Sequence, residues 1–183
     1  MKSFRDILIS ALALMLIAGI VTAALAGTNA LTKNTIALRT EQIENEARAE
    51  VIKDATSFEK NEITANGESV VYYVGMNNGA ACGYVFTVSS VGKSSGLMVM
   101  VGIGADGAVQ GVKITDDNET AGYVGKIEKD ENFLPSLLGK TTKEEVETVD
   151  AVSQATKTSN GVRKAVTQAL EWYQLAKGVN ADE

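Results

Sequence analysis

The chain opens with a long uninterrupted apolar stretch, a pattern that predicts a membrane helix. No residue between Ile7 and Asn29 carries a charge, and the run reads ILISALALMLIAGIVTAALAG. A helix needs about 20 apolar residues to cross the hydrocarbon core of a bilayer. Lys2 and Arg5 precede the run and the next basic residue is Lys33, so the positive-inside rule favours a cytoplasmic N-terminus and an exported remainder.

A cleaved signal peptide is the alternative interpretation of the same segment. Ala24-Leu25-Ala26 places small residues where signal peptidase requires them. The apolar run is longer than the roughly 7 to 15 residues that are usual for the core of a signal peptide, which favours a retained helix. We therefore expect a transmembrane anchor over residues 1–30, and both interpretations export the rest of the chain.

Helical spacing continues beyond the anchor. Ile36, Ile43, Ala47 and Val51 recur at helical intervals in a Thr- and Glu-rich segment, which predicts a helical stalk over residues 31–60. A solvated charged helix with only an anchoring role would show the same pattern.

The pattern changes to strands from Ser69 onward. Four runs rich in β-branched and aromatic residues follow one another: VVYYVGM, AACGYVFTVSS, LMVMVGIG and AVQGVKITDD. They are separated by turn signals at Asn77-Asn78-Gly79, at 92–96 and at Asp106-Gly107. Short turns between consecutive strands predict a four-stranded antiparallel meander, one face of which needs cover.

Helices downstream can cover that face. Residues 162–177 place apolar side chains on one side of a helix, with Gly178 as an expected stop. A second helix is expected through TKEEVETV, beginning near Thr141 or Thr142. The expected fold class is α+β, a twisted antiparallel sheet packed by helices over residues 61–183.

Composition narrows the classes of function. The chain has 45% hydrophobic and 22% charged residues, a balance typical of a domain with a closed core. Its net charge of −6 argues against binding to nucleic acid. With no His and Cys82 as its single Cys, the chain lacks the ligands and bases for a Ser-His-Asp triad, a zinc hydrolase site or a Cys-ligated iron–sulfur cluster. Cys82 lies in an apolar run and is expected to be a small buried hydrophobe without a functional role.

Two polar, glycine-containing stretches are the candidates for chemistry. The first runs from Asp116 to Lys126 after the fourth expected strand, and the second from Asp150 to Ser159 before the long amphipathic helix. A hydroxyl-rich turn entering a helix can offer backbone N–H groups and the positive end of the helix dipole to an anion such as phosphate. The residues alone leave a second interpretation open, since Ser159 or Thr158 could serve as an ordinary N-cap without a ligand.

The sequence DAVSQAT at residues 150–156 resembles the flavinylation motif of the FMN-binding domain family. In that motif Asp, two further residues, Ser or Thr, usually Gly, and then Ala-Thr end at the residue esterified to the FMN phosphate. The matching positions are Asp150, Ser153, Ala155 and Thr156, while Gln154 stands where the family usually has Gly. The resemblance implies that FMN is attached covalently to Thr156, with Thr158 as the alternative acceptor hydroxyl.

The earlier stretch is similar to Glu-Thr-Pro-Gly-Leu-Gly, which family members often show beside the flavin. Glu119, Thr120 and Gly122 match, Ala121 replaces Pro, and Tyr123-Val124 precede Gly125 where one residue is expected. The resemblance implies a flavin pocket here. Tyr123 and Val124 either pack on the isoalloxazine ring or belong to the core, and Lys126 either offsets the charge of the phosphate or reduced flavin or is an exposed cation at a helix start.

The resemblance covers most of the chain, and the length and order of its parts are most similar to G subunits of the Rnf complex, a ferredoxin:NAD oxidoreductase coupled to ion transport. C subunits of the sodium-pumping NADH:quinone oxidoreductase are close relatives and generally longer. The resemblance implies an electron-transfer subunit of the cytoplasmic membrane, with other membrane subunits as partners, a flavin transferase acting during maturation, and no complete enzyme in this chain alone. A stand-alone extracellular flavin carrier and an exported cofactor-free binding module that uses the 116–126 loop are the alternatives.

Overall fold

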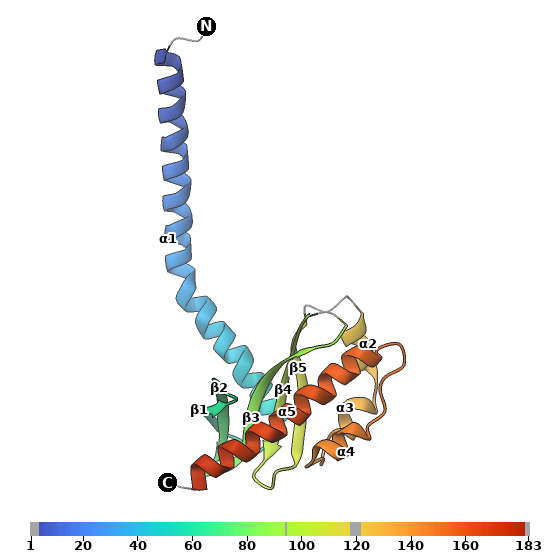
Figure 1. Cartoon of the computed structure of the whole chain (residues 1–183). Coiled ribbons are helices and arrows are strands. Elements are labelled where there is room, and N and C mark those ends of the chain that lie inside the picture. Colours follow the sequence, from blue (N-terminus) through green and yellow to red (C-terminus); the bar gives the residue numbers. More distant parts are fainter. Residues whose placement is uncertain (1–3, 94, 118–121, 182–183) are drawn as a thin grey trace. The chain divides into compact units, whose positions relative to one another are not determined.

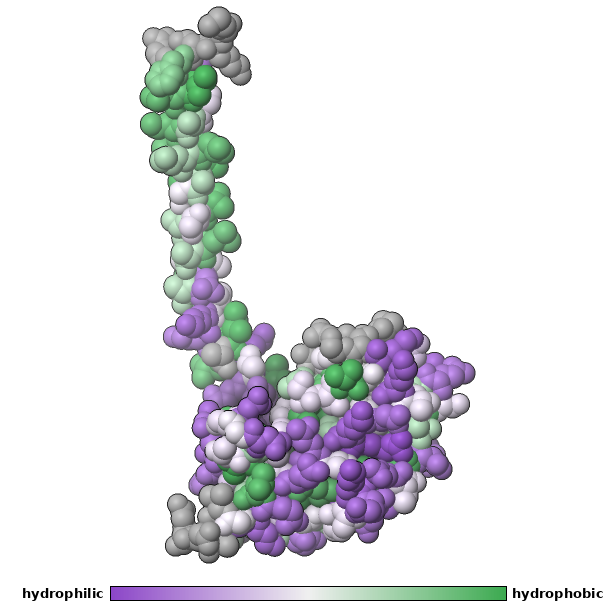
Figure 2. All heavy atoms as spheres, viewed as in Figure 1, coloured by the Kyte–Doolittle hydropathy of each residue, from purple (hydrophilic) through white to green (hydrophobic). Residues whose placement is uncertain are grey.

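The computed structural model describes residues 4–93, 95–117 and 122–181 of the chain. The chain divides into two compact units, Met1–Glu44 and Asn45–Glu183, each of which is described by itself. Helix α1, Phe4–Val51, provides the first unit, and its last turns belong to the second. The apolar side chains of its first half are exposed, as Figure 2 shows, and the helix is long and apolar enough to cross a membrane. The expected apolar N-terminal helix is thus confirmed.

The second unit is built on an antiparallel meander of five strands within the described residues. The strands pair in sequence order and are β1 Ser57–Ala65, β2 Glu68–Asn77, β3 Ala80–Val91, β4 Ser95–Gly104 and β5 Val109–Asp117. Four of them match the expected runs, and β1 is an edge strand that the sequence pattern did not predict. The expected α+β class is confirmed, with one strand more than expected.

The predicted hairpin at Asn78-Gly79 is present, and both residues have positive φ, 50° and 80°. These values are those of the tight two-residue turn whose twist matches the twist of the flanking strands. Asn66-Gly67 form a second turn of the same kind between β1 and β2, with φ values of 53° and 82°. These two turns fix the register of the first three strands.

Helix α5, Thr156–Ala181, covers one face of the sheet (Figure 1). The shorter helices α2 Tyr123–Lys129, α3 Phe133–Ser136 and α4 Lys143–Glu147 lie beside it, and α2 and α4 contact α5. The long helix α5 crosses the sheet over β3, β4 and β1. Its apolar stripe packs in the larger core, where the most deeply buried members of α5 are Val162, Ala165, Val166, Ala169, Tyr173 and Ala176. This is the amphipathic helix that the sequence predicted.

The ends of two of these helices can be compared with the expected signals. Helix α4 begins as expected, because Thr142 caps it and forms a capping box with Glu145. Gly178 was expected to end α5, and this expectation was wrong because the helix continues to Ala181. A Cβ at Gly178 would meet no atom within 4 Å, so no packing contact forces the chain to turn there.

The other face of the sheet receives the last turn of α1 and the residues that follow it. Val51 and Ile52 are buried there with Ala47, Val85 and Met100. Four strand glycines make this approach possible, and we call them the glycine track: Gly75, Gly83, Gly102 and Gly111. A Cβ at Gly102 would lie 2.4 Å from the Val51 carbonyl oxygen, and one at Gly111 would lie 2.5 Å from Val51 Cα. The sheet can therefore hold this segment only where it has no side chains.

Candidate flavin-attachment site

The segment that resembles the flavinylation motif forms a tight turn at the start of α5. The N–H of Ala155 donates to the carbonyl oxygen of Val152 at 3.0 Å, and the helix begins at the next residue, Thr156. Gln154 has a φ of 63°, in the left-handed region. This conformation costs a residue with a Cβ about 1–2 kcal/mol, and glycine adopts it freely. The turn thus has the geometry that glycine favours at the position where this chain has Gln154.

Ser159, a residue of α5, stabilises this turn through hydrogen bonds of its side chain. Its hydroxyl accepts a hydrogen bond from the N–H of Val152 at 3.0 Å and donates one to the carbonyl oxygen of Ala155 at 3.1 Å. Ser159 is fully buried. Because α5 begins at Thr156, neither Ser159 nor Thr158 is the N-cap of the helix, and that alternative is wrong.

The two candidate acceptor hydroxyls lie in opposite environments. Thr156 is exposed in the first turn of α5, whereas Thr158 is 0% exposed. The first N–H groups of an α-helix lack intrahelical partners and carry the positive end of the helix dipole. An anion attached to Thr156 would lie beside these groups and beside the exposed Lys157. Of these two threonine hydroxyls, the structure leaves only that of Thr156 accessible, at a helix start that favours a negative charge.

Residues of the earlier stretch meet this turn. Gly122, with a φ of 97°, is the N-cap of α2, and the Nζ of Lys126 in that helix donates to the side-chain oxygen of Gln154 at 2.9 Å. The side chain of Val124 is 4% exposed and belongs to the core, while Tyr123 is half-buried at its edge. Glu119 and Thr120 lie outside the described residues.

A hollow of about 260 Å³ lies over the turn. It is lined by residues 154–158, by Tyr123 and by Lys93 from the turn between β3 and β4. The Nζ of Lys93 donates to the hydroxyl of Tyr123 and lies 4.1 Å from the centre of its ring. This hydrogen bond and the charge of Lys93 lower the pKa of Tyr123 below its usual value, and Lys126 adds to the effect. Lys93 was not predicted from the sequence, in which it lies 63 positions before Thr156.

Gly161 explains how the β3–β4 turn reaches the start of α5. A Cβ at Gly161 would lie 2.9 Å from the carbonyl oxygen of Val91 and 3.2 Å from Gly92 Cα. The missing side chain lets the helix approach the strand end closely, and the hydroxyl of Ser90 donates to the carbonyl oxygen of Gly161 at 2.8 Å. This contact brings Lys93 to the hollow.

The other matched motif residues face a different hollow. Asp150 and Ser153 line a cavity of about 430 Å³ together with residues of the 130–140 segment, among them Asp130 and Lys140. Thr156 lines the smaller hollow. The structure thus separates the residues of the motif into two groups that border two different cavities.

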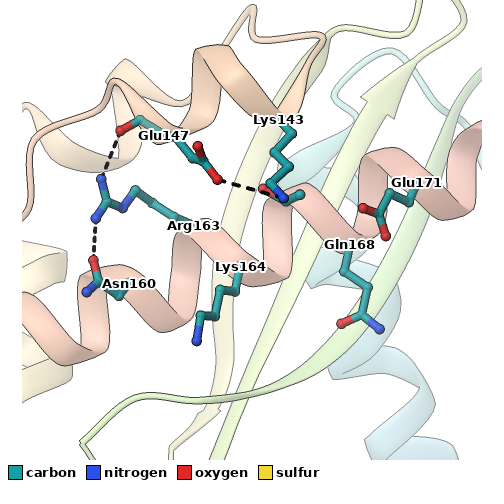
Figure 3. Close-up of a pocket in the computed structure, with 8 residues that line it drawn as sticks. Lys143, Glu147, Asn160, Arg163, Lys164, Gln168 and Glu171 are labelled. Carbon is teal, nitrogen blue, oxygen red and sulfur yellow. Dashed lines mark hydrogen bonds and ion pairs between the residues drawn. The ribbon is translucent and has the colours of Figure 1, made fainter.

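Arg163 holds the chain segment that leads into the motif. Its guanidinium donates to the carbonyl oxygen of Val149 at 2.7 Å. It also donates to the carbonyl oxygen of Glu147 at 3.2 Å and to the side chain of Asn160 (Figure 3). The surrounding hollow of about 640 Å³ lies between α4 and α5 and is lined by side chains of both charges. Its lining residues are Lys143, Glu147, Asn160, Arg163, Lys164, Thr167, Gln168 and Glu171. Arg163 therefore stabilises the segment before the turn at residues 152–155 through the carbonyl groups of that segment.

These features fit the FMN nucleotide as the resemblance implies it. An exposed hydroxyl stands at a helix start, Lys93 and Lys157 line the same hollow, Lys126 bonds to Gln154 in the turn, and the ring of Tyr123 offers an aromatic wall. FMN carries a phosphate at one end and a flat aromatic ring system at the other, so each end has a matching surface here.

Comparison with known proteins assigns both parts of the chain. The model of the FMN-binding domain family matches residues 92–171, and the model of the RnfG N-terminal region matches residues 1–51. A protein of Acetobacterium woodii is named as the G subunit of the Na(+)-translocating ferredoxin:NAD(+) oxidoreductase complex. The chain is 32% identical to it over 89% of its own length and 89% of the relative.

Two further relatives carry related names. The G subunit of the proton-translocating ferredoxin:NAD(+) oxidoreductase complex of Clostridium ljungdahlii is 27% identical over 77% of each chain. The G subunit of the ion-translocating oxidoreductase complex of Methanosarcina acetivorans is 28% identical over 97% of this chain and 100% of the relative. Since the matches extend from the N-terminal helix through residue 171, the chain belongs to the family of G subunits of Rnf-type ion-translocating oxidoreductase complexes and contains an FMN-binding domain.

Proposed function

We propose that this protein carries FMN as a phosphoester on Thr156 and passes electrons between other centres of a membrane redox complex. The observation that supports this most strongly is the contrast between the two threonines in the first turn of α5. Thr156 is exposed and Thr158 is fully buried. A flavin transferase can reach only the first of them in the folded domain.

The electrostatics of the turn favour the phosphate that this bond would place there. The phosphoester forms between the Thr156 Oγ1 and the FMN phosphorus, with the net loss of one water relative to free FMN and threonine. The remaining negative charge would be adjacent to the start of α5 and to Lys157, which suits an anion. Gln154 and Lys126 join the motif turn to α2 through their side chains, and so they fix the position of the acceptor.

Bound FMN would supply one- and two-electron redox chemistry, for which the protein needs to provide position and electrostatics. The residues of this chain have those tasks. Tyr123 offers a wall of the hollow, Ser159 holds the turn, and Val124 anchors α2 in the core. The absence of His from the sequence is compatible with such a carrier, because electron transfer requires no general base on the protein.

The test of the attachment replaces each hydroxyl in turn. When the full chain is produced and exported in cells that contain a flavin transferase, its intact mass should exceed the polypeptide mass by FMN less one water, and the flavin should survive denaturation. Thr156→Val keeps the shape of the side chain but removes the acceptor, and so it should abolish covalent flavin. Thr158→Val should remain flavinylated.

Two outcomes would contradict the proposal. If Thr156→Val retains covalent flavin and Thr158→Val loses it, the acceptor is assigned to the wrong residue. If the unsubstituted chain never acquires flavin under these conditions, the covalent carrier itself is refuted, and an exported binding module without cofactor becomes the better account.

We further propose that the domain lies outside the cytoplasm and works within a complex. The relatives are named as complex subunits, and Lys2 and Arg5 precede the apolar segment. Protease added to intact cells should digest the domain, and protection until lysis would reverse the orientation. The purified flavinylated chain should oxidise NADH only slowly on its own. Rapid turnover of NADH would favour a complete enzyme over an electron carrier.

A further inference from the structure

The environment of Lys93 points to a role in holding the reduced cofactor. Lys93 reaches the hollow above Thr156 from the β3–β4 turn, outside both motif stretches. Its Nζ donates to the hydroxyl of Tyr123 and lies 4.1 Å from the ring centre. Lys126 lies on the same ring at 5.6 Å from its centre, and also reaches Gln154. Two cations from separate elements are thus gathered around one aromatic wall.

We propose that Lys93 stabilises the negative charge that a flavin in this hollow gains on reduction, and thereby raises its midpoint potential. The inference rests on the proposed binding of FMN at Thr156. Two electrons and one proton convert the neutral oxidised ring into an anion, so a nearby cation favours the reduced form. The phosphate is less suited to explain Lys93, because the helix start and Lys157 already surround its attachment point.

The phenol of Tyr123 reports the sign of the potential at this wall. Lys93, through its hydrogen bond and its charge, holds the pKa of Tyr123 below the usual value, and Lys126 acts in the same direction. The same positive potential that favours a phenolate favours any other anion beside it. A reduced flavin against Tyr123 would therefore be favoured over an oxidised one.

The close contact at Gly161 indicates that the position of Lys93 is built into the fold. Val91 and Gly92 can lie against α5 only because Gly161 has no side chain, and Ser90 bonds to its carbonyl oxygen. Lys93 is the next residue after this contact. The backbone just before Lys93 is thus in contact with α5, the helix that begins at Thr156.

The test compares three variants of the full flavinylated chain in detergent. Lys93→Gln removes the charge, Lys93→Arg keeps it, and Lys164→Gln removes a lysine that lines the separate hollow between α4 and α5. For a partly exposed charge pair, Lys93→Gln should reduce the preference for reduced flavin about two- to fivefold. For a two-electron couple this equals a fall in midpoint potential of about 10 to 20 mV. The midpoint potential of Lys93→Arg should stay close to that of the unsubstituted chain. The potential of Lys164→Gln should shift less than half as much as that of Lys93→Gln.

Salt and the Tyr123 titration separate an electrostatic role from a structural one. The difference in midpoint potential between Lys93→Gln and the unsubstituted chain should shrink as added salt screens the charge of Lys93. The pKa of Tyr123 should rise in Lys93→Gln. A raised Tyr123 pKa with an unchanged midpoint potential would mean that Lys93 only fastens Tyr123, and would overturn the proposal. Equal shifts in Lys93→Gln and Lys164→Gln would overturn it as well, since they would reflect net charge alone.

A second measurement keeps this inference separate from covalent attachment. In the Thr156→Val background, the ratio of the affinity for added reduced FMN to the affinity for added oxidised FMN can be measured. Lys93→Gln should lower this ratio about two- to fivefold. If the unsubstituted chain acquires no covalent flavin while this ratio behaves as expected, the attachment fails and the role of Lys93 stands. If Thr156→Val binds neither form, or the ratio is unchanged by Lys93→Gln, the role of Lys93 is refuted.

Discussion

The glycine track can be tested by adding one methyl group to it. Gly111 lies on β5 with Val51 directly against it, and a Cβ there would lie 2.5 Å from Val51 Cα and 2.7 Å from the Val51 carbonyl oxygen. Both of these atoms belong to the backbone, so no side-chain rotation can relieve the contact. Gly111→Ala must therefore either compress the contact or push the segment away from the sheet.

The cost of each response can be bounded. Overpacking a well-packed core typically costs about 1–3 kcal/mol, whereas releasing the segment would expose Val51 and Ile52, each worth about 1.5–3 kcal/mol when fully buried. Compression with a small shift is the cheaper response. Replacing glycine by alanine returns about 0.5–1 kcal/mol through the entropy of the unfolded chain. The middle of these two ranges gives a net loss of about 1 kcal/mol, which for a domain of this size lowers Tm by roughly 3 to 5 °C.

Thermal unfolding of the full chain in detergent, followed by near-UV circular dichroism, measures this loss. Gly178→Ala is the control, because a Cβ there meets nothing within 4 Å, and it should leave Tm unchanged or raise it slightly. Gly102→Ala also presses on Val51, at 2.4 Å from its carbonyl oxygen. Since both substitutions displace the same residue, the double variant should lose clearly less than the sum of the two. A Gly111→Ala chain as stable as the unsubstituted one, or strictly additive losses, would refute this account of the packing.

Two further outcomes are expected. Gln154→Gly removes the strain of a side chain in the left-handed region at φ 63°. Because glycine also loses more backbone entropy on folding, the substitution should raise the unfolding free energy by no more than about 1 kcal/mol. Flavinylation, measured by intact mass, should be retained, and its loss would mean that the Gln154 side chain itself is required. The N–H of Thr141 donates to the Glu145 carboxylate at 2.8 Å and lowers its pKa from 4.5. A carboxylate whose pKa is lower in the folded state than in the unfolded state stabilises the fold at a pH above its unfolded-state pKa, and this stabilisation is lost as pH falls through its folded-state pKa. The Tm difference between the unsubstituted chain and Glu145→Gln should therefore shrink between about pH 5 and pH 3. A difference that is the same at about pH 7 and about pH 3 would contradict it.

Most of the fold was visible in the sequence because its elements carry strong local signals. The hairpin at Asn78-Gly79, the helix beginning near Thr142 and the apolar stripe of α5 each appear in the structure as predicted. Strand β1 was missed because it lies at the sheet edge, where Ile63 and Ala65 are its buried hydrophobic residues and charged residues occupy much of the rest. An edge strand needs few apolar side chains, so its sequence lacks the alternation of apolar and polar residues that predicts a strand. Its real signal was the Asn66-Gly67 turn that follows it.

The site was predictable only as far as it is contiguous in sequence. The motif indicated Thr156 and the turn before it, but Lys93 reaches the same hollow through the contact between Gly161 and the end of β3. Such a contact depends on the absence of a side chain at one position and on the register of the sheet. A lysine inside the glycine-bounded turn at 92–96 was the signal that could have drawn attention to it.

The burial of Thr158 also bears on the order of events when the protein matures. In an unfolded chain Thr156 and Thr158, separated by a single residue, present equivalent hydroxyls to any modifying enzyme. Docking of α5 on the sheet withdraws Thr158 from solvent and leaves Thr156 exposed. If FMN is attached as proposed, folding would therefore restrict the choice of acceptor, because a transferase that acts on the folded domain would meet only the hydroxyl of Thr156.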